Sequence, residues 1–291
     1  MKLLLAFFAA ANLVGQYRHP IVFGRAHVDE GLQSKIWIME EDGSKLRPLT
    51  SGSTYDDHPS VYSDLRHVLY SEFPVNALDR AAGARLIKLN IETGAREVVA
   101  EAAGCALHHA SLSPFRDLLA YHRDCGKRLS QWVGWGPGSY EVNTVATNGV
   151  AMPDGIIFMH EKNRGMGVRG VSLARMYGHG VGAKMIFLTD DTHLHRRPAV
   201  SPDGKLLAWQ TNLSGNQDEI FLANIDASNP RNLTDAPGDD GHPWFSRDGK
   251  WIVFESNRTG SWEIWKINLE TRKGVQLTFG GKKYESTRPR M

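Results

Sequence analysis

One phrase occurs twice in this chain and constrains its fold more than any other feature. Residues 197–210 read Arg-Pro-Ala-Val-Ser-Pro-Asp-Gly-Lys-Leu-Leu-Ala-Trp-Gln, and residues 242–255 read His-Pro-Trp-Phe-Ser-Arg-Asp-Gly-Lys-Trp-Ile-Val-Phe-Glu. The two copies align without a gap at a distance of 45 residues. A fixed period of this size indicates an array of similar supersecondary units.

Further copies of the phrase extend the array over most of the chain. The first residue of each legible copy is one of His58, His109, Arg197, His242 and Arg288. The interval from 109 to 197 is about two periods, which predicts one degenerate unit between them. Its best trace is Pro153-Asp154-Gly155 followed by Ile156-Ile157-Phe158. A second marker, Leu-Thr, closes four units at Leu49-Thr50, Leu188-Thr189, Leu233-Thr234 and Leu277-Thr278.

The residues within one unit favour β-structure. Ser201-Pro202-Asp203-Gly204-Lys205 is a tight-turn sequence, because Pro presets φ and Gly accepts a positive φ. It joins two short apolar runs, as in a hairpin. Residues 219–224 and 231–234 then predict a third and a fourth strand. Four strands in about 45 residues are typical of one blade of a β-propeller.

The two ends of the chain complement each other. The first unit has candidates for the second, third and fourth strands at 21–23, 35–38 and 46–49, but it lacks a first strand. The final Arg288-Pro289 segment matches the start of the phrase and supplies that strand. We therefore predict an all-β, six-bladed propeller of four-stranded antiparallel blades. Its ring is closed by N- and C-terminal segments that share one blade, which leaves no free sheet edge at the closure.

Composition and charge narrow the classes of protein. The 291 residues fit one large domain, and the net charge of +2 without a long basic run speaks against nucleic acid as a partner. Met1-Lys2 followed by the apolar run 3–11 is similar to a short secretory signal, with cleavage after Ala11 or near Gly15. The alternative is a buried N-terminal segment. We expect a signal peptide at 1–15, one propeller domain at 16–291 and no membrane span.

The blade phrase with its downstream Leu-Thr resembles the TolB-type repeat, the WD40-like PD40 repeat of bacterial periplasmic and secreted proteins. This resemblance covers about residues 17–291 and implies the propeller fold and a periplasmic or secreted location. It is weak for function, because such blades occur in scaffold proteins, in propeller domains of peptidases and in polysaccharide lyases. From the sequence we expect neither a separate N-terminal domain like that of TolB nor a peptidase domain after the propeller.

The residues that open the phrase are expected to encircle one mouth of the central channel. All five legible ones, His58, His109, Arg197, His242 and Arg288, can carry positive charge, which favours an anionic ligand. The alternative is that they only pack against neighbouring blades. The second strands end at the same mouth and add His122, Arg123 and His160. If Pro114 pairs with Asp117 across the turn, paired residue numbers sum to 231, so His109 and His122 should face each other.

The two cysteines lie on the same predicted hairpin. Cys105 and Cys125 sum to 230, one off the pairing line, so they should be near neighbours and form a disulfide in an exported protein. A metal site is the alternative, because Cys105, His108, His122 and Cys125 offer two thiols and two imidazoles, ligands that zinc binds tetrahedrally. Two free thiols are the third reading. No organic cofactor is expected, and a divalent metal, zinc or calcium, stays open.

Two functions remain after these steps. The first is an exported propeller that binds an acidic glycan, a peptide or a protein segment at its mouth, as a monomer. The second is a lyase that cleaves uronate-containing polysaccharide by β-elimination. In that reaction cations neutralise the uronate carboxylate while His or Tyr moves the protons. The residues that would carry the elimination are His109, His122, Arg123, Tyr177 and Arg197.

Overall fold

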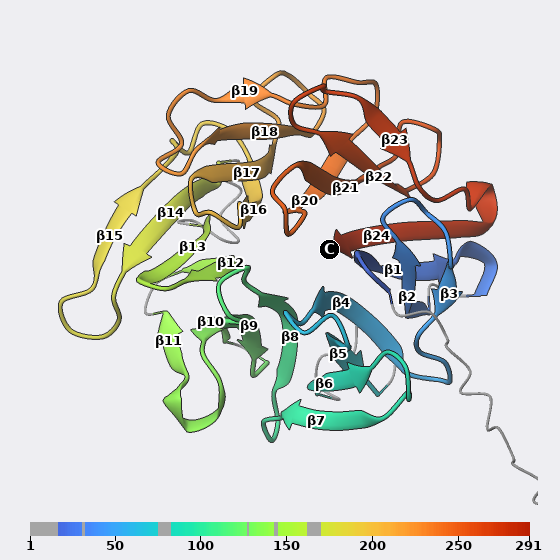
Figure 1. The fold of residues 1–291 in the computed structure, drawn as a ribbon. Helices are drawn as coiled ribbons and strands as arrows, with labels where there is room; N and C mark the ends of the chain where they lie inside the picture. The colour runs from blue at the N-terminus through green and yellow to red at the C-terminus, as the bar shows by residue number, and fades with distance from the viewer. Residues whose placement is uncertain (1–16, 31–32, 75–82, 127, 143–144, 162–169) are drawn as a thin grey trace, which may run out of the picture.

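The computed structural model of the chain is a six-bladed β-propeller (Figure 1). It describes residues 17–30, 33–74, 83–126, 128–142, 145–161 and 170–291, so the expected signal peptide lies outside the described residues. The described strands form six four-stranded antiparallel sheets, each of which is one blade. The predicted fold class is confirmed.

The blades follow one another around the ring in chain order. Blade 1 holds β24 (Tyr284–Arg290), β1 (Pro20–His27), β2 (Ser34–Glu40) and β3 (Arg47–Pro48). Blade 2 holds β4 (Tyr55–Val61), β5 (His67–Phe73), β6 (Arg85–Asn90) and β7 (Arg96–Ala100). Blade 3 holds β8 (Ala106–Leu112), β9 (Leu119–Asp124), β10 (Leu129–Val133) and β11 (Tyr140–Val142).

The second half of the chain repeats the pattern. Blade 4 holds β12 (Ala146–Met152), β13 (Gly155–His160), β14 (Ser172–Tyr177) and β15 (Lys184–Phe187). Blade 5 holds β16 (His195–Val200), β17 (Leu206–Thr211), β18 (Glu219–Asn224) and β19 (Arg231–Asn232). Blade 6 holds β20 (Asp240–Phe245), β21 (Trp251–Ser256), β22 (Glu263–Asn268) and β23 (Gly274–Gln276).

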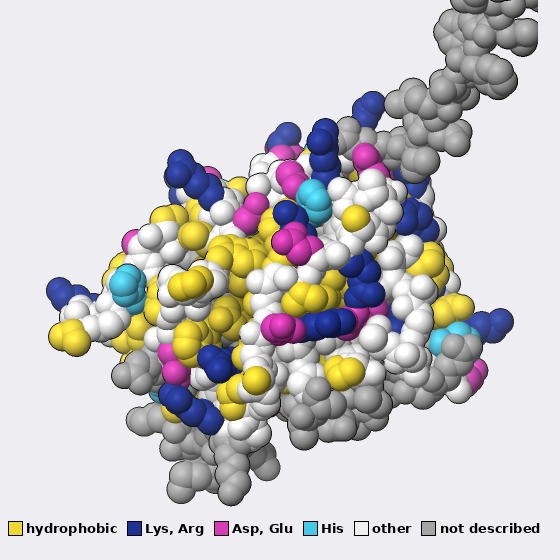
Figure 2. Space-filling view, turned by 90° about the horizontal axis from the view of Figure 1, so that it is seen from below, with side chains coloured by type: hydrophobic (Ala, Val, Ile, Leu, Met, Phe, Trp, Pro, Cys, Tyr) yellow, Lys and Arg dark blue, Asp and Glu magenta, His cyan; other side chains and the backbone are white. Residues whose placement is uncertain are grey.

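Three short 3₁₀ helices complete the described elements: η1 (Val28–Glu30), η3 (Gly136–Gly138) and η4 (Gly281–Lys283). Among the described residues, none of the helices has the length and apolar character needed to cross a membrane. The side of the disc carries charged side chains of both signs among apolar ones (Figure 2). This mixture agrees with the small net charge of +2.

The repeated phrase builds the hairpin between the first two strands of a blade. The Ser201 hydroxyl donates to Asp203 at 2.6 Å and accepts from the backbone N–H of Leu206 at 2.9 Å, while Gly204 takes a φ of 71°. Ser246, Asp248 and Trp251 make the same two hydrogen bonds in blade 6. The Ser-x-Asp-Gly pattern is therefore the sequence of a hydrogen-bonded turn whose Gly sits in the left-handed region.

The Leu-Thr marker holds the outer strand of a blade. The hydroxyl oxygens of Thr50, Thr189, Thr234 and Thr278 each accept a hydrogen bond from a third-strand backbone N–H, at 2.8–3.0 Å. Leu233 and Leu277, which precede two of these threonines, are buried in the apolar core between blades. One dipeptide thus satisfies a backbone donor and contributes to blade packing.

The ends of the chain close the ring as predicted. β24 pairs antiparallel with β1, with Arg25 opposite Ser286 and His27 opposite Tyr284. The C-terminus lies near the centre of the ring (Figure 1). The degenerate unit is also confirmed, because Pro153 and Asp154 lie in the turn between β12 and β13.

We call the face of the disc that carries these first hairpin turns the turn face. The opposite face, where the first strands begin and the second strands end, is the mouth face. The first strands line the central channel between the two faces, as expected for a propeller (Figure 1).

Candidate functional site

Every first strand has an irregularity at the same position. In all six blades the pairing register shifts by one residue, so that two residues of the first strand oppose one residue of the second. The first residue of each pair has φ between 49° and 55°, in the left-handed region that non-Gly residues rarely adopt. These six residues, which we call the channel ring, are His58, His109, Asn148, Arg197, His242 and Arg288.

Five members of the channel ring are the residues that open the repeated phrase. The sixth, Asn148, was missed because blade 4 does not preserve the residues that open the repeated phrase. Its signal was the turn: Arg197 precedes Pro202 by five residues, and Asn148 precedes Pro153 by the same interval. Counting back from the Pro-Asp-Gly turn would have found it.

The irregularity also accounts for the pairing in blade 3. Ser111 pairs with Ala120 on the predicted sum of 231, but His108 pairs with His122 on a sum of 230. The bulge at His109 makes this change of register. His109 still faces His122: their rings stack with centroids 4.7 Å apart at 17°.

The same change of register aligns the two cysteines. Cys105 and Cys125 form a disulfide, with their Cα atoms 4.2 Å apart. Because the two sulfur atoms are bonded to each other, they are not available as thiolate ligands for zinc with His108 and His122. What the structure does bring together is an imidazole cluster, with nitrogens of His108, His109 and His122 within 4.8 Å of one another.

The hydrogen bonds of the cluster show which nitrogens are engaged. His122 Nε2 accepts from the backbone N–H of Asn148 at 2.7 Å, so its proton lies on Nδ1. His108 Nδ1 and His109 Nδ1 are 2.5 Å apart, which requires one to donate and the other to accept. The ring of His58 of blade 2 lies against that of His109, with centroids 3.7 Å apart and planes tilted by 36°. The cluster is a hydrogen-bonded stack in the channel wall.

Two buried carboxylates partner the channel ring. Asp57 accepts from Arg288 Nη1 at 2.9 Å and lies 3.1 Å from His58 Nδ1. Glu255 lies 2.7 Å from His242 Nδ1 and accepts from the backbone N–H of Arg288 at 2.6 Å. Sequence reasoning had not singled out Asp57, whose signal is its place directly before the ring residue His58.

These contacts set the charges of the channel ring. Burial lowers the pKa of His58 to about 3 and of His242 to about 4, and it holds the pKa of His109 well below its ordinary value. The three histidines are therefore neutral near pH 7. Burial opposes ionisation of Glu255, but His242 and Arg288 outweigh it and hold its pKa at about 2. Both carboxylates are ionised, since Arg288 and His58 likewise lower the pKa of Asp57 against burial.

Arg197 differs from Arg288 in its partners. Arg288 is neutralised by Asp57, and its pKa is raised. Arg197 Nη1 donates to the side-chain oxygen of Asn148, and no carboxylate of the described chain lies within 4.0 Å of its guanidinium. Burial and the nearby Arg288 lower the pKa of Arg197 to about 10, so it still carries its charge at neutral pH. The ring thus holds one arginine without a carboxylate contact.

The other predicted site residues lie farther from the channel ring. Arg123 packs over the Trp132 ring of β10 at 5.4 Å. His160 lies against Phe187 of the outer strand, with ring centroids 5.1 Å apart. Tyr177 pairs with Gly155 at the turn-face end of blade 4. Of the residues named for a lyase, the structure brings together His109 and His122, with Arg197 on the same ring.

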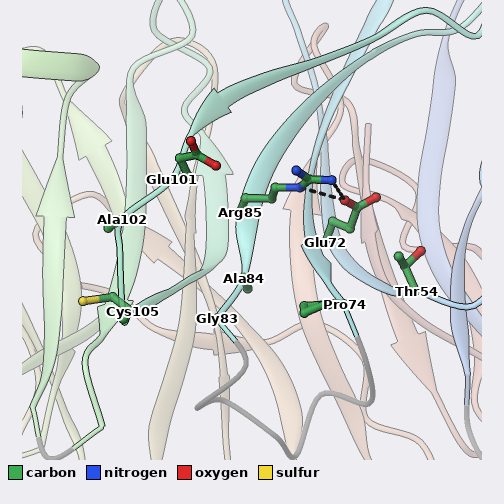
Figure 3. Close-up of a pocket in the computed structure, with 10 residues that line it drawn as sticks. Thr54, Glu72, Pro74, Gly83, Ala84, Arg85, Glu101, Ala102 and Cys105 are labelled. Atoms are coloured by element: carbon green, nitrogen blue, oxygen red, sulfur yellow. Dashed lines mark hydrogen bonds and ion pairs between the residues drawn. The ribbon is translucent and has the colours of Figure 1, made fainter.

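A pocket of about 450 Å³ opens beside blades 2 and 3 and includes Glu72, Arg85 and Cys105 (Figure 3). Arg85 donates to Glu72 at 2.9 Å, and Arg96 also bonds to this carboxylate. Glu72 is thus paired with two arginines of its own blade. Glu255 and Asp57 are the acidic partners of the ring itself.

Comparison with known proteins agrees with this architecture. Residues 184–291 match the family model described as the TolB beta propeller domain, PD40. The chain is a TolB-like six-bladed β-propeller. An uncharacterized protein of Agrobacterium fabrum is 36% identical over 81 residues of this TolB-like propeller. The aligned segment is 27% of the present chain and spans about a quarter, 26%, of that relative's length.

Solved structures resemble the TolB-like propeller at low sequence identity. TolB from Acinetobacter baumannii matches with a TM-score of 0.77 and 18% identity, covering 95% of this chain and 67% of that one. The putative TolB from Agrobacterium tumefaciens matches with a TM-score of 0.66 and 15% identity, covering 89% and 88%. An oligogalacturonate lyase from Vibrio parahaemolyticus matches with a TM-score of 0.53 and 15% identity, covering 83% and 74%. At these identities the likeness concerns the fold.

Proposed function

We propose that this TolB-like propeller binds an anionic group of an acidic glycan, peptide or protein segment at its channel ring. The observation that carries the proposal is Arg197, a charged guanidinium in the channel wall with an amide partner and no carboxylate contact in the described chain. Buried charges in proteins are ordinarily paired, so such an arginine favours an anionic partner from outside. The neutral histidines supply shape and hydrogen bonds rather than charge.

Calorimetric titration tests this proposal. The probes are trigalacturonate and hexa-aspartate, with uncharged maltotriose as the matched ligand control. We expect at least one acidic probe to bind and Arg197→Gln to weaken its binding by about tenfold or more, as expected for loss of a charge-assisted contact. Arg231→Gln, on the exposed outer strand β19, is the matched protein control. Equal binding of maltotriose, or full affinity in Arg197→Gln, would refute the proposal.

The alternative function is β-elimination on uronate polysaccharide. It is favoured by the stacked His109–His122 pair, which could exchange a proton, and by the same fold in a protein named oligogalacturonate lyase. The test incubates the protein with polygalacturonate and follows the ultraviolet absorbance of an unsaturated product. A rise that His122→Ala abolishes supports the lyase. A flat trace together with tight binding of the acidic probe supports the binding function.

Export is part of the proposed function. The Cys105–Cys125 disulfide is typical of proteins in an oxidising compartment, and residues 1–15 read as a signal peptide. We expect the mature protein to begin between Asn12 and Tyr17 and to appear in the periplasmic or extracellular fraction. N-terminal sequencing of the fractionated protein tests this. An intact Met1 in a cytoplasmic fraction would contradict it.

A further inference from the structure

A small void lies at the channel ring itself and is lined by five of the six ring residues, His58, His109, Asn148, Arg197 and His242. Its volume is about 20 Å³, enough for one water-sized particle. Arg197 of blade 5 and Arg290 of blade 1 both line it, and Trp244 of blade 6 lies in the wall between them. The void is part of the molecule's centre, where strands from different blades converge.

Arg290 stands where the other first strands carry no charge. It follows the ring residue Arg288 by two positions, and the equivalent residues are Ser60, Ser111, Val150, Ala199 and Trp244. Its guanidinium packs over the Trp244 ring at 4.5 Å. Sequence reasoning had not singled out this arginine, since it lies outside the repeated column of His and Arg.

The two arginines of the void have few partners. Arg290 Nη1 donates to the backbone oxygen of its neighbour Pro289, and Arg290 Nε is buried without a hydrogen bond. No described carboxylate lies within 4.0 Å of either guanidinium. Asp57 and Glu255 attract both arginines from beyond contact distance, but these carboxylates are in contact with Arg288 and His242.

The charge balance around the void is positive by one unit. Arg197, Arg288 and Arg290 give three positive charges, and Asp57 and Glu255 give two negative charges, while the ring histidines are neutral. Burial and the neighbouring Arg197 lower the pKa of Arg290 to about 10, which leaves it charged at neutral pH. Two adjacent buried cations with an empty space beside them call for one compensating negative charge.

We propose that the void binds one small monovalent inorganic anion, chloride under ordinary conditions, between Arg197 and Arg290. A void with room for one water-sized particle suits a monatomic anion, and the single excess charge matches a monovalent ion. The guanidinium N–H groups are donors without acceptor capacity, so they suit an anion and not a metal cation. This anion would be a structural component of the propeller, and it would share Arg197 with the ligand proposed for the channel ring.

Thermal unfolding of the full chain tests the anion. Chloride is raised from about 5 mM to about 200 mM while sodium gluconate holds the ionic strength constant, and a site with millimolar affinity then raises the melting temperature by about 4 °C. Bromide should act like chloride, whereas gluconate, which is too large for the void, should not. Equal melting temperatures in chloride and gluconate would overturn the proposal.

A variant and a direct observation identify the site. Arg290→Met keeps an unbranched side chain on Trp244 but removes the charge, so we expect the chloride dependence to disappear. We also expect a melting temperature in low chloride no lower than that of the unaltered chain. Arg231→Met on β19 should retain the full dependence. Loss of the dependence in Arg231→Met, or its persistence in Arg290→Met, would count against the site.

Crystals soaked in bromide give an answer that does not depend on how any variant folds. An anomalous peak between Arg197 and Arg290 is expected, and a peak only at the protein surface would contradict the proposal. This outcome is separable from the function proposed for the channel ring. Acidic probes can fail to bind while the halide effect and the bromide peak remain, and the reverse is equally measurable.

Discussion

The left-handed backbone of the channel ring predicts an unusual effect of glycine on stability. At most strand positions glycine destabilises a protein relative to alanine. At His109 the φ of 53° reverses the preference, so His109→Gly should be more stable than His109→Ala. Both variants remove the imidazole and its contacts with His58 and His122, so the difference between them isolates the backbone.

The magnitude follows from two opposing contributions. An L-residue pays about 1–2 kcal/mol to occupy the left-handed region. Glycine avoids this penalty but loses about 0.5–1 kcal/mol more conformational freedom on folding. The balance favours His109→Gly over His109→Ala by about 1 kcal/mol. The neighbouring Ala110 has no positive φ, so Ala110→Gly should instead destabilise the protein by about 0.5–1 kcal/mol.

Urea denaturation followed by tryptophan fluorescence measures both differences, since the chain has 8 tryptophans. With a denaturant slope of about 3 kcal/mol per molar urea, the midpoint of His109→Gly should exceed that of His109→Ala by about 0.3 M. The same pair of substitutions at His242, where φ is 49°, repeats the test in another blade. If alanine proves as stable as glycine at both positions, the argument from the ring backbone is wrong.

Three further predictions concern the contacts around the ring and within the blades. Reduction of Cys105–Cys125, which closes a loop of 20 residues, should lower the free energy of unfolding by about 3 kcal/mol. The double serine variant should show the same loss and no response to reductant, and a reductant effect in that variant would disprove the assignment. His242 has a pKa of about 4 in the folded protein, below its ordinary value of 6.5, so the unfolded chain binds its proton first. Stability should therefore fall as the pH is lowered from 6.5 to 4, and His242→Gln should reduce the slope of the unfolding free energy by up to about 1.4 kcal/mol per pH unit; an unchanged slope would contradict this. Thr278 accepts from a backbone N–H and donates to the buried Glu263 at 2.5 Å, so Thr278→Val should cost about 2–3 kcal/mol. Thr50→Val, which loses the acceptor for one backbone N–H, should cost about 1 kcal/mol less, and equal midpoints in urea for the two variants would refute the role of the carboxylate.

The repeat permitted much of the fold to be predicted, because its residues have local physical roles. Ser201, Asp203 and Gly204 form a turn through hydrogen bonds that span at most five residues. The turn can therefore be predicted wherever this sequence pattern recurs. Thr278 acts within its own blade in the same way. The closure by residues 288–290 followed from counting units. Asn148 was not identified as a ring residue because its blade keeps the turn sequence but not the first residues of the repeated phrase.

The sequence predicted most residues of the candidate site, but not the ion pairs that set their charges. The column of His and Arg was visible, but the carboxylate partner of Arg288 comes from a neighbouring blade, far away in sequence. Arg288 meets Asp57 at a separation of 231 residues. The sequence indicated a basic mouth with few carboxylates, and it did not show that Asp57 neutralises Arg288.

The sequence by itself determined the number of blades, their four strands, the closure of the ring and five of the six residues that line the channel. These properties depend on the residues of each turn and on the spacing of the repeats, and both can be read directly from the sequence. Only the tertiary structure decided the rest. The bulge at each ring residue shifts the register by one, so that in blade 3 His108, and not His109, pairs with His122. The packing of six blades around the channel determines which arginines contact a carboxylate. Buried charges depend on their direct neighbours, and at the centre these neighbours come from segments that are far apart in the sequence.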